Sequence, residues 1–360
     1  MALPSSGTIK YSQIIAEFGT PTSGGLGEFR ISESVGSLNN LPLDSDTCGP
    51  NANADIPQTG PIKFSDFYNS RLNQIVDLHS IGNNTSRQNA KDRWNNGNVH
   101  IVGSSKTGKT RPPDTVDDKV IINVNKTIAS VKGTQTHCAL RTGTWDSNTS
   151  LKIEIGTSGE LYGSGGDGGS GGSANETAGT DGQTGSSALG IEYPCTINNL
   201  GVIQSGYGGG GGGGGNTRTT GGGKKSGATT NGSSGGGGGG GAGSPAGDAG
   251  GVQTPLKDGG GTAGSAGAAG SLSNLVTGAG TGGAGGSEAG DGGDASAVNN
   301  SATKAEDGDV YLDGNGDQQS ADGGTGGNNG YAIITNQGSA PSLTGGGSLT
   351  GRTITSTNPT

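Results

Sequence analysis

The chain has 360 residues, of which 81 are glycine, and only 27% of the residues are hydrophobic and 4% aromatic. This composition leaves too little apolar surface for conventional cores throughout, so much of the chain must be stabilised by backbone hydrogen bonds or be disordered. The net charge of −9 argues against nucleic acid or an anionic membrane surface as a partner.

The three cysteines, Cys48, Cys138 and Cys195, lie far apart and form no CxxC or Cys/His cluster. This spacing argues against a disulfide framework and against zinc. The N-terminus has no signal-peptide pattern, and no stretch approaches the roughly 20 apolar residues that span a bilayer. We therefore expect no metal or other cofactor, no membrane insertion, and a protein that is made in a cytoplasm and leaves it by lysis.

Residues 1–74 contain an internal echo, because Ser6–Ile14 resembles Thr59–Phe67. Both copies have a turn followed by Ile-Lys-aromatic and a serine, a residue that often begins a helix. We expect short helices over about Tyr11–Phe18 and Phe64–Tyr68. We interpret these residues as a unit that docks the chain on a larger assembly, and the alternative is a small irregular domain without that role.

Residues 75–160 are expected to form a small β domain. Short apolar or alternating runs, separated by clusters of Gly, Asn, Asp and Pro, are typical of strands. The runs are Ile75–Leu78, Val99–Val102, Val120–Val124, Ile128–Val131 and Leu151–Ile155. The only two tryptophans, Trp94 and Trp145, lie in this region, which suits anchors of a core.

Glycine dominates the rest of the chain: 65 of the 81 glycines lie between residues 163 and 360. The longest runs are Gly208–Gly215 and Gly235–Gly241. A repeated unit precedes the glycine stretches and consists of an apolar strand, a tight turn and a second short strand. The units begin at Leu151, at Cys195 and, in degenerate form, at Tyr331. Linkers do not usually carry such units, so the repeat indicates an ordered architecture.

Three structures are open to glycine-rich sequence. Flexible linkers are the commonest. Collagen is excluded, because its three-residue repeat breaks by Ala174 and only 13 residues are proline. The third is a bundle of polyproline-II helices, whose outward N–H and C=O groups bond neighbouring helices where glycine permits close approach. We favour this bundle over a disordered linker.

Candidate sites for chemistry are few. The segment Gly103–Thr110 matches the phosphate-binding pattern GxxxxGKT, but Pro112 and Pro113 prevent the helix that must follow it. Asp313–Asp317 is the best candidate for a calcium loop, although it lacks the usual spacing and the terminal Glu. No catalytic motif is present, and we expect the protein not to be an enzyme.

Several segments together resemble glycine-rich virion proteins of tailed bacteriophages. The opening Met1–Gly7 and its echo at Gly60–Tyr68 look like the N-termini of phage structural and fibre-associated proteins. Val120–Val124, Leu140–Trp145 and the passage from Leu151 to Gly169 look like the strand-turn-glycine region of their adhesins. The glycine-rich half is similar to distal tail-fibre adhesins of T-even-like phages, which fold as a sandwich of packed polyproline-II helices.

The resemblance implies a mainly β fold with polyproline-II structure. It would comprise a docking unit (1–74), a short-stranded β domain (75–160), and a glycine-rich bundle of packed polyproline-II helices with receptor-facing loops (161–360).

The function implied is that of a tail fibre or fibre-tip adhesin in the virion. Its partners would be other virion proteins of the fibre or baseplate and a host surface protein or glycan, within a symmetric oligomer. The receptor contacts predicted near the ends of the glycine runs are Tyr207, Arg218, Lys224 and Lys225, although Tyr207 could instead pack inside and the cations could only aid solubility. The alternative function is a purely structural virion component, such as a head or tail appendage or an assembly adaptor.

Overall fold

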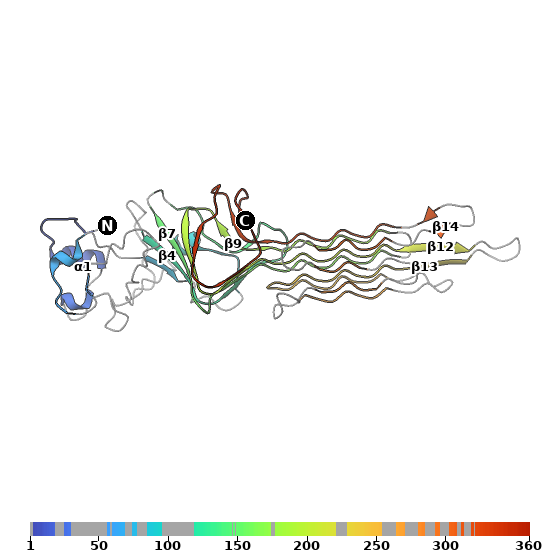
Figure 1. The fold of residues 1–360 in the computed structure, drawn as a ribbon, viewed down its shortest axis with the longest axis horizontal. Helices are drawn as coiled ribbons and strands as arrows, with labels where there is room; N and C mark the ends of the chain where they lie inside the picture. Colours follow the sequence, from blue (N-terminus) through green and yellow to red (C-terminus); the bar gives the residue numbers. More distant parts are fainter. Residues whose placement is uncertain are drawn as a thin grey trace.

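A computed structural model describes most of the chain. The described residues are 3–18, 25–29, 56–57, 60–68, 74–77, 85–95, 119–145, 147, 149–173, 177–220, 229–253, 264–270, 280–284, 292–295, 302–307, 311–312, 318–319 and 321–360. The molecule is elongated, with a small helical unit at one end, β-sheets in the middle and a glycine-rich extension at the other end (Figure 1).

In the described part of the chain, fifteen strands form three parallel sheets of five strands each. Sheet A has the order β1-β4-β7-β10-β17, sheet B β18-β11-β8-β5-β2, and sheet C β19-β16-β9-β6-β3. The chain visits A, B and C in turn and repeats this circuit five times, so the strands build a three-sided solenoid of five rungs. Two further pairs, β12-β13 and β14-β15, are antiparallel.

The elements are short, as expected for the sides of a solenoid. The helices are α1 (Tyr11–Phe18), α2 (Ala90–Asn95) and the 3₁₀ turns η1 (Leu26–Phe29) and η3 (Phe64–Phe67). The strands are β1 (Gln74–Asp77), β2 (Thr85–Ser86), β3 (Gln88–Asn89), β4 (Lys119–Val124), β5 (Thr127–Ala129), β6 (Cys138–Arg141), β7 (Ser150–Ile155), β8 (Glu160–Tyr162), β9 (Ser187–Ile191), β10 (Cys195–Asn199), β11 (Val202–Gln204), β12 (Asn216–Thr220), β13 (Thr229–Ser233), β14 (Tyr311–Leu312), β15 (Gln318–Gln319), β16 (Tyr331–Thr335), β17 (Ser342–Thr344), β18 (Ser348–Thr350) and β19 (Arg352–Ile354).

The core of the solenoid is a set of stacked side-chain columns. Paired residues of parallel strands in register point to the same face of a sheet, so each column continues from rung to rung. In sheet A the column contains Ile122, Ile153 and Ile197, which are fully buried. In sheet B it contains Ile128, Leu161 and Ile203, and in sheet C Leu140, Leu189 and Ile333.

The N-terminal unit has a separate core. Ile14, Phe29 and Phe67 are fully buried in it, and the rings of Phe29 and Phe67 meet edge to face with centroids 6.0 Å apart. The two copies of the echo begin alike, because the backbone N–H groups of Lys10 and Lys63 each donate to the side chain three residues on, Gln13 and Asp66, at 2.8 Å. The predicted helix at 11–18 is confirmed, and the second is the shorter turn η3.

The strands predicted at 75–78, 120–124, 128–131 and 151–155 are confirmed as β1, β4, β5 and β7, with bounds shifted by one or two residues. The strand predicted at 99–102 lies outside the described residues. Trp145 is a core anchor as expected, since it is 5% exposed and its indole N–H donates to the Thr142 carbonyl at 2.9 Å. Trp94 lies in α2, and its expected role as a core anchor stays a prediction.

The predicted fold class is wrong in its main specific feature. The regular structure is mostly three parallel sheets with few helices, and the structure gives no support for a bundle of polyproline-II helices. The strands of each repeated unit do not form a self-contained β domain, because they pair in parallel with the matching strands of the units before and after. The domain limits at residues 74 and 160 stay a prediction. Among the described residues, no helix is long and apolar enough to cross a membrane.

Candidate functional site

A glycine-rich arm projects from one corner of the solenoid. It consists of the described residues within 163–186, between β8 and β9, and within 205–330, between β11 and β16. Both insertions leave the end of a sheet B strand and return to the start of a sheet C strand. In the rung below, residues 130–137 make the same connection directly. Insertions at one corner of successive rungs lie side by side, so the two glycine-rich insertions form one extension (Figure 1).

Backbone hydrogen bonds join the extended segments of the arm at every third residue. The N–H groups of Gly166, Gly169 and Gly172 donate at 2.8 Å to the carbonyls of Tyr207, Gly210 and Gly213, in that order. Consecutive residues of the central run donate to different neighbours: Gly209, Gly210 and Gly211 donate to Gln183, Gly239 and Thr303. The run is therefore enclosed by hydrogen-bonded chain, and Gly208–Gly215 is buried.

Glycine is required in this run because of close approach. A Cβ at Gly209 would lie 2.1 Å from the Asp167 carbonyl oxygen, and one at Gly210 would lie 1.9 Å from that of Gly293. Real Cβ atoms do not approach backbone oxygens so closely. Without side chains, the segments approach until their amides bond directly, and this network replaces the apolar core that the composition does not supply.

Polar side chains at the surface of the arm satisfy outward-facing backbone donors. Carboxylate oxygens of Asp167, Asp181, Asp294 and Asp307 accept from backbone N–H groups of neighbouring segments at 2.7–2.8 Å. The Thr180 hydroxyl accepts from the Ser170 N–H at 2.7 Å in the same way. These carboxylates thus accept hydrogen bonds from backbone N–H groups at the surface of the arm. No group of three or more potential metal ligands occurs among the described residues, and the calcium candidate at 313–317 lies outside them.

Acid should loosen the segment of the arm that contains Gly323 and Thr325. The pKa of Asp181 is lowered from its ordinary 3.8 by hydrogen bonds from Thr325, and that of Asp307 by the Gly323 N–H and by Lys304. A lowered folded-state pKa means that the stabilisation is present above 3.8 and is lost as the pH falls through the folded value. Hydrogen exchange, corrected for its intrinsic rate, should show the Thr325 and Gly323 amides losing protection as the pH falls below 3.8.

The Gly330 amide supplies the control for this pH dependence, because it donates to the Gly206 carbonyl, which does not titrate. Its protection should stay constant over the same range. In Asp181→Asn the acid step should disappear at Thr325 and persist at Gly323. An equal loss at all three amides would show global unfolding instead of release of these two carboxylates.

Lys132 fastens the arm to the solenoid. It lies in the short corner connection and its Nζ donates to Asp167 at 2.5 Å and to Asp248 at 2.8 Å, two residues from different segments of the arm. Burial alone would lower the pKa of Lys132, but the hydrogen bonds to the two carboxylates raise it above 10.5. The Asp248 N–H also donates to Asp167. The three residues together fix the base of the arm against the β-sheets.

The far end of the arm carries the two antiparallel pairs. β12 pairs with β13 and contacts both β14 and β15. Figure 1 shows β12, β13 and β14 at the end of the molecule opposite the N-terminus. The paired strands β12 and β13 contain Asn, Thr, Ser, Gly and Arg and no aliphatic residue. Sequence reasoning placed the ends of glycine runs here, but it missed that the two pairs meet.

The four predicted contact residues fall in different places. Arg218 lies on β12 opposite Asn231, and Lys224 and Lys225 lie outside the described residues. Tyr207 is at the other end of the run, where the chain leaves the solenoid, and its side chain is 1% exposed. Its burial raises its pKa, and its hydroxyl has no hydrogen-bond partner among the described residues. Tyr207 is therefore not accessible for direct contact, which agrees with the packing role left open above.

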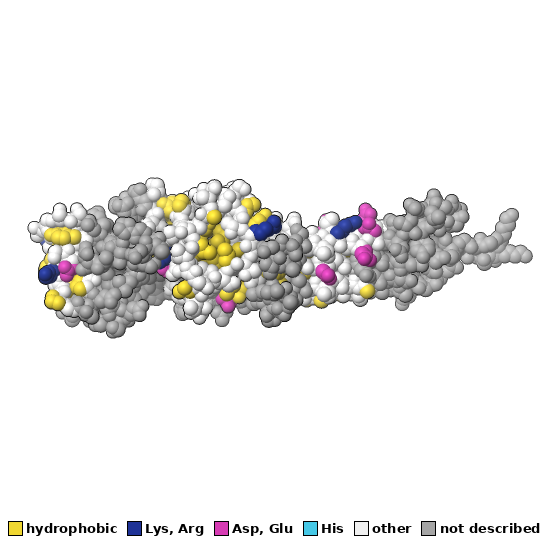
Figure 2. Space-filling model, viewed as in Figure 1, with side chains coloured by type: hydrophobic (Ala, Val, Ile, Leu, Met, Phe, Trp, Pro, Cys, Tyr) yellow, Lys and Arg dark blue, Asp and Glu magenta, His cyan; other side chains and the backbone are white. Residues whose placement is uncertain are grey.

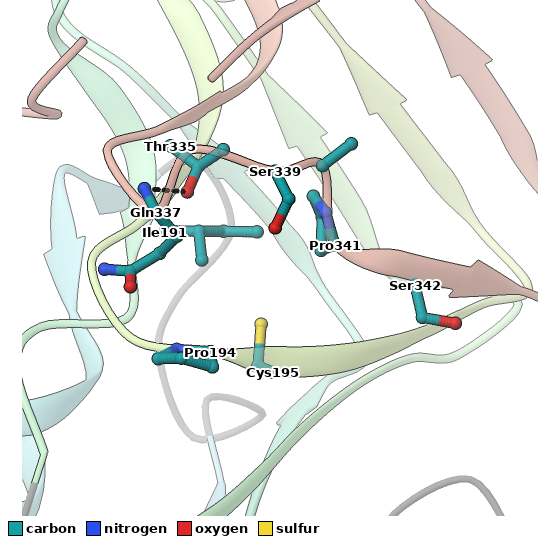
Figure 3. A pocket seen from close by; sticks show the side chains of 9 residues that line it. Ile191, Pro194, Cys195, Thr335, Gln337, Ser339, Pro341 and Ser342 are labelled. Carbon is teal, nitrogen blue, oxygen red and sulfur yellow. Dashed lines mark hydrogen bonds between the residues drawn. The ribbon is translucent and has the colours of Figure 1, made fainter. Parts of the chain in front are cut away.

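A small hollow lies on the side of the solenoid. It has a volume of about 190 Å³ and is lined by Ile191, Pro194, Cys195, Thr335, Gln337, Ser339, Ala340, Pro341 and Ser342 (Figure 3). The Gln337 amide donates to the Glu192 carbonyl at 2.8 Å. None of the lining residues is charged, and the thiol of Cys195 is the one titratable side chain among them. The phosphate-loop match at 103–110 lies outside the described residues.

Comparison with known proteins identifies the family. The model of the family described as Phage tail fibre adhesin Gp38 matches residues 89–354, which is 266 of the 360 residues. Neither the search of curated proteins nor that of solved structures gave a match. The matched region runs from the first rung of the solenoid through the whole arm to the last strand. The chain therefore belongs to the phage tail fibre adhesin Gp38 family, a structural and non-enzymatic kind of virion protein.

Proposed function

We propose that this adhesin binds a receptor on the host bacterium through the far end of its glycine-rich arm. The observation that carries the proposal is the meeting of two antiparallel strand pairs, β12-β13 and β14-β15, at the end of the molecule opposite the N-terminal unit. Binding residues are often carried by loops held on a rigid scaffold. The hydrogen-bonded arm supplies such a scaffold.

The chemistry of this end suits a polar receptor surface. The sequences of β12 and β13 consist mainly of hydroxyl and amide residues, and Arg218 carries a cation with five N–H donors. We propose that Arg218, Lys224 and Lys225 contact the receptor, a surface protein or glycan. Tyr207 would act at a distance by fixing the start of the run that leads to β12.

The N-terminal unit is the proposed attachment to the virion. It has its own core and lies at the opposite end from the two strand pairs (Figure 1). Attachment there to a fibre or baseplate protein would leave the arm pointing away from the particle. The protein would then act within a symmetric oligomer in the virion and would be released with it on lysis.

Adsorption of the purified protein to host cells tests the proposal. The wild-type protein should bind and should compete with phage for adsorption, whereas the triple variant Arg218→Ala, Lys224→Ala, Lys225→Ala should bind at least tenfold more weakly. Lys126→Ala, which removes a cation from a turn of the solenoid, is the matched control and should bind as the wild type does. A wild-type protein that neither binds nor competes would instead support the purely structural virion component.

A further inference from the structure

The last rung of the solenoid leaves all three sheets open. β17, β18 and β19 are the final strands of sheets A, B and C, and among the described strands each has a partner on one side only. In β18 the Thr350 carbonyl accepts from the Ser205 N–H. Because backbone groups alternate in direction along a strand, Leu349 turns its N–H and C=O away from β11. Unpaired edges of this kind are templates for strand addition.

The core columns are also exposed at this end. Leu343 continues the sheet A column beyond Ile197, and Leu349 continues the sheet B column beyond Ile203. Ile197 and Ile203 are 0% exposed, whereas Leu343 and Leu349 are both 40% exposed. These two leucines belong to the inward-facing columns but have no further rung above them.

The two ends of the solenoid differ. At the first rung, α2 follows β3 directly, contacts β1, and contributes the fully buried Ala90 to the core. At the last rung no described element covers the columns. Figure 1 shows the red C-terminal segment on the side facing the viewer, and Figure 2 shows hydrophobic side chains gathered over the solenoid on that side. Solenoids normally end in a polar capping repeat, so an open apolar end indicates an interface.

We propose that this open end binds the same end of a second copy of the chain. The open edges of β17, β18 and β19 surround one core, so all three can pair at once only with another three-sided rung. A second copy of the chain has such a rung at its own open end. A twofold axis across the contact would reverse the direction of its strands, so the edges would pair antiparallel and Leu343 and Leu349 would be covered in both copies.

The charge of the surface permits this contact. The chain carries a net charge of −9, but residues 338–360 contain no acidic residue. Their only basic residue is Arg352, whose guanidinium carbon lies 5.3 Å from the ring centroid of Tyr331. Two acidic molecules can therefore meet end to end here without opposing carboxylates. This inference does not depend on receptor binding, because the arm leaves from a corner and not from the open end.

The mass of the full-length protein in solution tests the inference. Light scattering and sedimentation over a concentration series should give twice the 34.8 kDa of one chain for the wild type. Leu349→Pro removes an outward N–H without breaking the bonds to β11, and should give the mass of one chain. Leu343→Asp should do the same. Val252→Asp alters an equally exposed side chain (40%) on the arm and should stay dimeric.

Circular dichroism establishes that each variant is folded. A wild type that remains a single chain up to about 100 µM would overturn the inference, and so would a folded Leu349→Pro that remains dimeric. Cell binding is measured on the same samples. A monomeric Leu349→Pro that still adsorbs to host cells would confirm the interface while leaving the receptor site unaffected, so failures of the two proposals can be distinguished.

Discussion

Replacing Gly210 with alanine should disrupt the arm while leaving the solenoid folded. The new methyl group would lie 1.9 Å from the Gly293 carbonyl oxygen, and that segment cannot move away without losing its own hydrogen bonds, including the one from the Gly239 N–H. Overpacking usually costs about 1–3 kcal/mol and sometimes more. We expect the upper end of this range, because the clash is with backbone and not with a flexible side chain.

Limited proteolysis measures the effect directly. The wild type should resist a protease of broad specificity within residues 208–215, which are buried, and Gly210→Ala should be cut there at least tenfold faster. Gly251→Ala is the matched control in the same arm, because its Cβ would meet only the Ser170 hydroxyl oxygen at 3.8 Å. It should behave as the wild type does. Equal sensitivity of the two variants would mean that close packing of glycine does not hold the arm together.

Truncating Tyr207 to alanine should be the most destabilising change at the base of the arm. The side chain is 1% exposed, and its backbone joins two segments of the arm through the N–H to Ala242 (2.9 Å) and the carbonyl to Gly166 (2.8 Å). Removing a large buried ring costs about 3–5 kcal/mol. Thermal unfolding should show this loss, and receptor binding should fall with it because the run leading to β12 starts here.

Tyr207→Phe separates packing from direct contact. The hydroxyl has no hydrogen-bond partner among the described residues, and a buried unpaired polar group costs about 1–3 kcal/mol. Phenylalanine should therefore be as stable as tyrosine or more so, with unchanged adsorption to cells. A loss of adsorption without a loss of stability would show that the tyrosine hydroxyl itself contacts the receptor.

The local sequence pattern was sufficient to predict several individual helices and strands. The helix at Tyr11–Phe18 and the strands around residues 121, 128 and 153 follow from short-range apolar periodicity, and Trp145 follows from the scarcity of large side chains in the chain. The family was likewise accessible, because the quoted strand-turn-glycine passage overlaps the region that the family model matches. These features depend on residues close together in the sequence.

The pairing of strands between repeats could not be predicted from the sequence in the same way. The units beginning at Leu151 and Cys195 were recognised, but each reads equally well as a strand-turn-strand unit complete in itself. In the structure Ile153 pairs with Ile197 in sheet A and Leu161 with Ile203 in sheet B. Each partner is more than 40 residues away, and nothing in the local pattern specifies it. The prediction of a polyproline-II bundle was wrong because it did not include this pairing between distant strands.

The sequence by itself determined where glycine replaces side chains, where several of the apolar strands lie, and that the chain is an acidic, glycine-rich adhesin. Only the tertiary structure decided that the strands stack as five rungs, that both glycine insertions leave from one corner, and that Tyr207 lies inside at the base of the arm while Arg218 lies at its far end. The physical reason is that glycine has no side chain with which to specify a neighbour. Its partners are set by backbone hydrogen bonds between segments that the solenoid has already placed side by side.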